Sequence, residues 1–163
     1  MIRPFPPGFS RCPAYSDNAP GRYIVATGGL DGPGTGLWTP EQKDIEQAEK
    51  ALRLFLATPS SNTDSSFLTR MHEAGRQAVN SHYDSYALQF SGVRRPTGKF
   101  IYDTEGKGPK AISISGFCKG GSIKDDDLQK GEVLVSDGGS CYFRAVYDVD
   151  RNEIIYFSVN GRA

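Results

Sequence analysis

The chain has no surplus of either charge, because its 19 Lys and Arg residues balance its 19 Asp and Glu residues. Proteins that bind nucleic acids normally carry a basic surplus or a basic stripe. The densest basic stretch here is interrupted by acids and consists of Arg94, Arg95, Lys99, Lys107 and Lys110. We interpret this stretch as a solvated hairpin, and we expect no nucleic-acid partner.

Long apolar runs are also missing. No stretch of the sequence approaches the roughly 18 apolar residues that a membrane-spanning helix needs. The opening residues, MIRPFPPGFSRCPAY, lack the apolar core of a signal peptide. We therefore expect no membrane span and a cytoplasmic location, or a periplasmic one if a leader has been removed from the chain.

Cysteine and histidine are scarce. The three cysteines, Cys12, Cys118 and Cys141, are odd in number and do not suggest a disulfide framework. The only histidines are His72 and His82, and the sequence contains no CxxC pair. A zinc site would need distant residues to converge without any supporting spacing, so we predict no metal and no other cofactor.

The N-terminal residues 1–38 are rich in proline and glycine and include one possible short strand, RYIVAT, at 22–27. The glycines in GGLDGPGTG lack both the P-loop ending and the G-x-G-x-x-G spacing of nucleotide-binding loops. We interpret 1–38 as an arm across the surface of a single domain that spans 39–163, a length sufficient for one hydrophobic core.

Two helices are expected at the start of that domain. Thr39 at the N-cap, Pro40 at the first helical position and Gln42 at the third predict where the first helix begins. Its apolar stripe is formed by Ile45, Ala48, Leu52 and Phe55. The second helix is predicted over about 66–80, with His72 beside its buried side. That side is formed by Phe67, Leu68, Met71, Ala74, Ala78 and Val79.

After residue 82 the apolar period changes from 3.6 to 2, which predicts strands separated by turn residues. The expected strands cover 86–91, 98–103, 110–118, 132–137, 141–148 and 153–159. Helices followed by strands indicate an α+β fold. We expect two N-terminal helices packed on a curved antiparallel sheet of about five strands.

The stretch SDGGSCYFRAVYDVD, residues 136–150, resembles the nucleophile segment of ovarian-tumour-type deubiquitinases and, more faintly, that of papain-like proteases. In the deubiquitinase pattern Asp137 lies one place too far upstream, whereas the matching residues are Gly139, Ser140, Cys141, Phe143, Arg144 and Ala145. Both families place a histidine downstream of the cysteine to activate it, and no histidine follows Cys141 here. Strand alternation instead predicts Cys141 as a core thiol on the same face as Phe143.

Two other features need an interpretation, namely a disulfide between Cys118 and Cys141 and the segment DVDRNE. In a plain meander, Cys118 and Cys141 would lie roughly 15–20 Å apart, and a disulfide needs Cα atoms within about 7 Å, so no bridge between them is expected. The segment DVDRNE begins like a calcium loop at Asp148, Asp150 and Asn152 but lacks the later glycine and glutamate. We interpret it as a hairpin turn.

The strongest indication of function is a set of side chains predicted on the sheet face opposite the core. Alternation places Tyr142, Arg144 and Val146 on that face, and Tyr156 joins them if Ile155 points inward. Tyrosine and arginine are enriched at interface hot spots. Tyr142, Arg144 and Tyr156 are therefore the predicted partner-binding residues.

The C-terminal half, residues 83–163, resembles a loosely defined set of small bacterial proteins that end in V-x-DGG-x-CYF, then YD, then NG-x-A. The matching residues are Val135, Asp137, Gly138, Gly139, Cys141, Tyr142, Phe143, Tyr147, Asp148, Asn160, Gly161 and Ala163. The order of elements also resembles cystatin-type and nuclear-transport-factor-like folds, which serve as inhibitors, immunity proteins and ligand cups. The cystatin inhibitor motif Q-x-V-x-G is absent.

We expect a non-catalytic protein-binding module, such as a bacterial immunity protein or an inhibitor that caps a toxin or enzyme. One alternative is a small-ligand or enzymatic pocket of the nuclear-transport-factor type. A second alternative is a cysteine hydrolase that uses Cys141.

Overall fold

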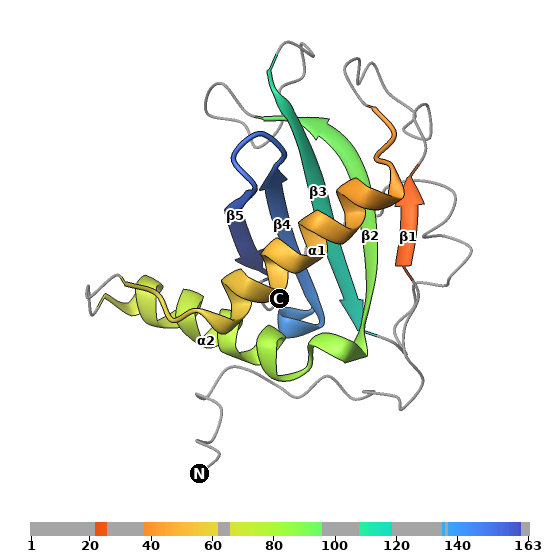
Figure 1. Ribbon diagram of the computed structural model, residues 1–163. Coiled ribbons are helices and arrows are strands. Elements are labelled where there is room, and N and C mark those ends of the chain that lie inside the picture. The colour runs from red at the N-terminus through yellow and green to blue at the C-terminus, as the bar shows by residue number, and fades with distance from the viewer. Residues whose placement is uncertain are drawn as a thin grey trace.

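The protein is described by a computed structural model that covers residues 38–61, 66–95, 108–118, 135 and 137–160, together with the backbone of 22–25. Two helices, α1 (Gln42–Ala57) and α2 (Phe67–Ser81), pack against one face of a sheet (Figure 1). The strands are β1 (Arg22–Val25), β2 (Tyr86–Arg94), β3 (Lys110–Cys118), β4 (Tyr142–Asp148) and β5 (Glu153–Val159). The predicted α+β class is confirmed.

The described strands lie in the order β1-β2-β3-β4-β5, and the sheet does not close. Strands β2 to β5 form an antiparallel meander, but β1 pairs in parallel with β2. The expectation of a wholly antiparallel sheet behind two N-terminal helices is therefore wrong at β1, which precedes α1. Parallel neighbours require a long crossover connection, and α1 and α2 supply it here.

Some expected elements lie outside the described residues. This holds for the strand expected over 98–103 and for the arm 1–38, of which only the backbone of 22–25 and residue 38 are described. Of the strand expected over 132–137, the structure describes residues 135 and 137, and neither has strand conformation.

Helix α1 begins later than the sequence predicts. Its N-cap is Glu41, whose backbone N–H donates to Asp44 Oδ2 over 2.9 Å. The prediction of Thr39 as the N-cap is wrong, because the capping box joins Glu41 and Asp44. The capping interaction therefore forms two residues further along, with Asp44 also placed favourably in the helix dipole.

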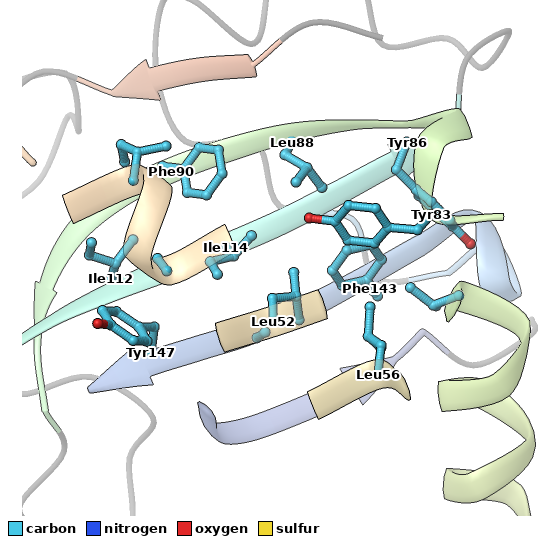
Figure 2. Packing of buried hydrophobic residues seen from close by; sticks show 14 of the residues in the cluster. Leu52, Leu56, Tyr83, Tyr86, Leu88, Phe90, Ile112, Ile114, Phe143 and Tyr147 are labelled. Atoms are coloured by element: carbon cyan, nitrogen blue, oxygen red, sulfur yellow. The ribbon is translucent and has the colours of Figure 1, made fainter. Parts of the chain in front are cut away.

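The hydrophobic core lies between the helices and the inner face of the sheet. Four residues of α1 are buried, namely Ile45, Ala48, Leu52 and Leu56. Figure 2 shows Leu52 and Leu56 converging with side chains of β2, β3 and β4. These strand residues include Tyr86, Leu88, Phe90, Ile112, Ile114, Phe143 and Tyr147. The predicted stripe of α1 is thus nearly correct, with Leu56 as its last buried member and Phe55 only partly buried.

One cross-strand pair sets the packing at the centre of this core. Gly116 of β3 lies directly opposite Phe143 of β4. A Cβ atom on Gly116 would lie 2.0 Å from Phe143 Cε1, so the ring occupies the space that any side chain there would need. The same ring packs edge-on against Tyr86, with centroids 5.0 Å apart.

The predicted buried side of α2 is wrong for its first turns. Phe67 and Leu68 are 67% and 69% exposed, and Met71 is exposed as well. Gly75 packs against Val159 at the end of β5, and the residues before it extend past the edge of the sheet (Figure 1). The apolar stripe is therefore buried only in the C-terminal half of the helix, while His72 is exposed near its edge as expected.

The two helices offer a matched pair of leucines that tests this arrangement. We expect Leu52→Ala to lower the free energy of unfolding by about 2–5 kcal/mol, because it opens a cavity in the core. Leu68→Ala should change it by less than about 0.5 kcal/mol, because Leu68 is exposed. Urea denaturation of both variants measures the difference, and equal losses would contradict the position of α2.

Candidate functional site

The outer face of the sheet, turned away from the helices, carries a polar row that crosses four strands. Gln89 of β2 pairs with Ser115 of β3, Ser115 with Arg144 of β4, and Arg144 with Ser158 of β5. Side chains alternate between faces along each strand, so Phe143 inside the core sends Arg144 outward. Arg144 therefore lies between two serine residues, one on each neighbouring strand.

Tyr142, Arg144 and Tyr156 line a single hollow on this face, which we call the outer-face hollow. Its volume is about 310 Å³. The other described residues that line it are Ser115, Gly116, Phe117, Val135, Phe143, Ser158 and Asn160. The three residues predicted from sequence are thus brought together, whereas the serines and Asn160 were missed. The missing signal was the strand register, which sequence alternation alone does not provide.

The ring of Tyr142 is held by a glycine turn and an aromatic neighbour. Gly138 has a left-handed backbone, with φ 107°, and a Cβ atom there would lie 2.3 Å from Tyr142 Cε2. The ring also packs edge-on against Phe117, with centroids 6.1 Å apart. The glycines of DGGSC therefore do more than turn the chain, since Gly138 makes room for Tyr142.

The other edge of the hollow is held by hydrogen bonds at the end of β5. Tyr156 donates its hydroxyl proton to Ser158 Oγ over 3.0 Å. Asn160 donates from its backbone N–H to the Tyr142 carbonyl over 2.9 Å, and its Nδ2 donates to the carbonyl of Val135. The segment before β4 is thereby tied to the segment after β5, next to the hollow.

A register shift in the β4–β5 pair re-orients part of β5. Val146 pairs with Tyr156, but Tyr147 pairs with Ile154, which leaves Ile155 as an extra residue. The expectation that Ile155 points inward is wrong, because Ile155 packs with Tyr156 against the outer-face cluster of Val93, Ala111 and Val146. Such a bulge changes which side chains share a face. Val146 itself is on the outer face as predicted, but it is buried there.

Cys141 packs against the main core, as predicted, but it is not a thiol, because its sulfur takes part in a disulfide. Cys118 is free and buried, so the two are not bridged to each other. Their predicted separation is nevertheless wrong: β3 pairs directly with β4, and Phe117 lies opposite Tyr142, so both cysteines adjoin the same cross-strand pair. Cys12, the remaining cysteine of the sequence, lies outside the described residues.

Burial raises the pKa of the Cys118 thiol to about 12. A thiol with so high a pKa holds almost no thiolate at neutral pH, and the thiolate is the nucleophile in cysteine chemistry. Cys118 is therefore unreactive in the folded chain despite its position near a disulfide.

The DVDRNE segment forms the β4–β5 hairpin, as the turn interpretation predicts. Asp148 is fully buried, and its Oδ1 accepts from the N–H groups of Asp150 and Arg151 while Arg95 pairs with Oδ2 at 2.9 Å. Burial raises the pKa of Asp148, but the N–H of Arg151, the Arg95 guanidinium and the N–H of Asp150 outweigh it and leave the pKa below its usual value. Asn152 completes the turn with a left-handed backbone, φ 53°.

The basic stretch at 94–110 makes structural contacts where it is described. Arg95 pairs with Asp148, Arg94 donates to the Gly108 carbonyl over 3.3 Å, and Lys110 Nζ lies 4.6 Å from the centroid of the Trp38 ring. Lys99 and Lys107 lie outside the described residues.

Within the described part of the chain, no cluster of three or more His, Cys, Asp or Glu residues is suited to hold a metal ion. Neither described helix is long and apolar enough to cross a membrane.

A second hollow, of about 510 Å³, lies at the β5 edge of the sheet, and we call it the edge hollow. Its lining includes His72, Glu73 and Arg76 of α2, Phe55 of α1 and Phe157 of β5. Arg76 is buried, donates to the Leu56 carbonyl at the end of α1 and pairs with Glu73. The hydrogen bond from Arg76 lowers the pKa of Glu73 below its usual value, so this carboxylate stays ionised at neutral pH.

Comparison of the chain with protein-family models, with curated proteins and with solved structures finds no match. The case for a function therefore rests on the two hollows and on the chemistry of the residues that line them.

The state of the cysteines can be tested by counting thiols. In the native protein we expect almost no reaction with Ellman's reagent, because Cys118 is buried and protonated. After unfolding without a reductant, one thiol per chain should react, and after reduction all three should. Cys118→Ala should remove that single thiol, whereas three reactive thiols in the unreduced, unfolded protein would contradict the disulfide.

The buried carboxylate of Asp148 predicts a pH-dependent contribution to stability. Because its folded-state pKa is lowered, it stabilises the fold above the unfolded value of about 3.9, and this stabilisation is lost as pH falls through the folded-state pKa. We expect Asp148→Asn to cost about 1.5–3 kcal/mol at pH 7, because it removes the charge that pairs with Arg95.

Urea denaturation from pH 7 to pH 3 tests this contribution, with Asp150→Asn in the exposed part of the same turn as the control. The gap between Asp148→Asn and wild type should narrow toward pH 3, while Asp150→Asn should stay within about 0.5 kcal/mol of wild type throughout. A gap that is constant with pH would show that the Asp148 charge does not stabilise the fold.

Proposed function

We propose that this chain is a non-catalytic protein-binding module that engages its partner through the outer-face hollow. The observation that carries the proposal is the convergence of Tyr142, Arg144 and Tyr156, from two strands, on one hollow. Tyrosine and arginine dominate the binding energy of many interfaces. Three such residues around one hollow form an anchor site for a partner side chain.

The site is also pre-ordered, which lowers the entropy lost on binding. Tyr142 packs against Gly138 and Phe117, and Tyr156 is hydrogen-bonded to Ser158. Arg144 is on the central part of a paired strand, with neighbours on both sides. Anchors held by strands keep their position better than anchors on loops.

Within this proposal the partner is a toxin or an enzyme that the chain caps, as an immunity protein or inhibitor would. We propose as well that the fold is of the cystatin or nuclear-transport-factor-like type, with a curved sheet of five strands behind the helices. This likeness supports the proposed function by analogy. The disulfide at Cys141 favours an oxidising compartment, such as the periplasm, over the cytoplasm. It also argues against the cysteine hydrolase, because a sulfur in a disulfide is not a nucleophile.

A small-ligand site is the second candidate, and the edge hollow favours it. His72 and the ionised Glu73 both line it, and Phe55 and Phe157 provide an apolar wall with ring centroids 5.4 Å apart. The space between helices and sheet, where a ligand cup of the nuclear-transport-factor type would lie, is occupied by the side chains in Figure 2. A ligand would therefore bind at the sheet edge.

A site-specific photo-crosslinker tests the protein-binding function. We place p-benzoylphenylalanine at Tyr156, beside the outer-face hollow, and in a control chain at Lys50, which is exposed on α1. Irradiation in the native host extract should yield a discrete crosslinked species from Tyr156 and none from Lys50. The same species should be lost when Tyr142→Ala and Arg144→Ala are added, provided that thermal denaturation shows these chains still fold.

The opposite pattern would reject the proposal. A partner captured from Lys50 but not from Tyr156, or one that persists after both alanine substitutions, would place the interface elsewhere. Purification of the captured partner and titration with the wild-type chain then give the affinity directly.

A further inference from the structure

We propose that the outer-face hollow recognises a carboxylate, the side chain of a glutamate or aspartate on the partner protein, through Arg144. This inference rests on the proposed function and names the chemistry that the hollow would bind. It starts from the charges: among the described residues that line the hollow, Arg144 carries the only formal charge.

The serines on either side of Arg144 add neutral donors of the kind that a carboxylate accepts from. Ser115 and Ser158 are its cross-strand neighbours, so both hydroxyls lie in the same row of the outer face. Tyr156 donates to Ser158 Oγ, which leaves the hydroxyl proton of Ser158 to be donated to another acceptor. The row therefore presents a cation flanked by hydroxyl groups.

Arg144 already takes part in an interaction within the chain. A guanidinium has five N–H donors, and a bidentate carboxylate uses two of them. A partner carboxylate therefore adds to the interactions of Arg144 or exchanges with them. Arg144 is half-buried between Tyr142 and Tyr156, and limited access to water strengthens an ion pair.

Charge and size favour a carboxylate over a phosphate. A phosphomonoester carries about −1.5 to −2 charges at neutral pH, more than Arg144, the one cation among the described lining residues, can balance. The volume of about 310 Å³ is near the lower end of the range for ligand pockets, about 300–1,000 Å³, and suits a side chain better than a large ligand.

The test uses a blocked peptide, Ac-Gly-Glu-Gly-NH₂, and its glutamine counterpart, followed by ¹H–¹⁵N NMR of the full chain. The glutamate peptide should shift the amides of Ser115, Arg144 and Ser158 in a saturable way. The glutamine peptide should bind at least about tenfold more weakly, the loss expected when a charge-assisted hydrogen bond becomes a neutral one.

Three Arg variants complete the experiment. Arg144→Gln should abolish the preference for glutamate, and Arg144→Lys should retain part of it, because lysine keeps the charge but loses the planar fork. Arg70→Gln, on an exposed position of α2, is the matched control and should leave the preference unchanged. Unperturbed amide spectra away from the hollow verify that each variant is folded.

Several outcomes would overturn the inference. These are the absence of saturable shifts, equal binding of the two peptides, an unchanged preference in Arg144→Gln, and tighter binding of inorganic phosphate than of the glutamate peptide. If the crosslinker at Tyr156 captures a partner while the peptides show no preference, the carboxylate inference fails alone. If glutamate is preferred but no partner is captured, the proposed protein-binding function fails and the carboxylate site stands.

Discussion

The register between β3 and β4 is the constraint on which the core and the outer-face hollow both depend. Gly116 leaves the space that the Phe143 ring fills, and this fit favours the observed alignment of the two strands. A slip of one residue would turn every side chain of β4 to the opposite face. It would bury the Arg144 guanidinium in an apolar core and expose Phe143, and both changes are costly. The core therefore determines where the hollow lies.

Much of the inner side of this arrangement was predictable from the sequence. The alternation in CYFRAVYD assigned Phe143, Ala145 and Tyr147 to the core, and all three are buried there. The stripe of α1 was predictable for the same reason, since helical and strand periods are local properties of the chain. Local signals also identified Tyr142 and Arg144 as outward-facing residues.

What the sequence could not provide were the long-range relations. The parallel pairing of β1 with β2, and the direct pairing of β3 with β4, depend on contacts between distant segments. The expected separation of Cys118 and Cys141 was wrong because a strand was expected between β3 and β4. The first turns of α2 were expected to be buried because periodicity shows which face is apolar, but not how far the sheet extends beneath it. Phe67 and Leu68 lie beyond that limit.

The bulge in β5 shows why the composition of the hollow also depends on a long-range relation. In a regular strand, Ile154 and Tyr156 would share a face, yet Ile154 packs against the main core and Tyr156 against the outer cluster. The extra residue, Ile155, reverses the alternation at that point, so Phe157 returns to the core and Ser158 lies beside Arg144. Without the bulge, Ile154 could not lie in the apolar core while Tyr156 points outward. The tyrosine and serine of β5 therefore reach the hollow because one residue of the strand is left unpaired, and bulges of this kind commonly re-aim side chains near functional sites.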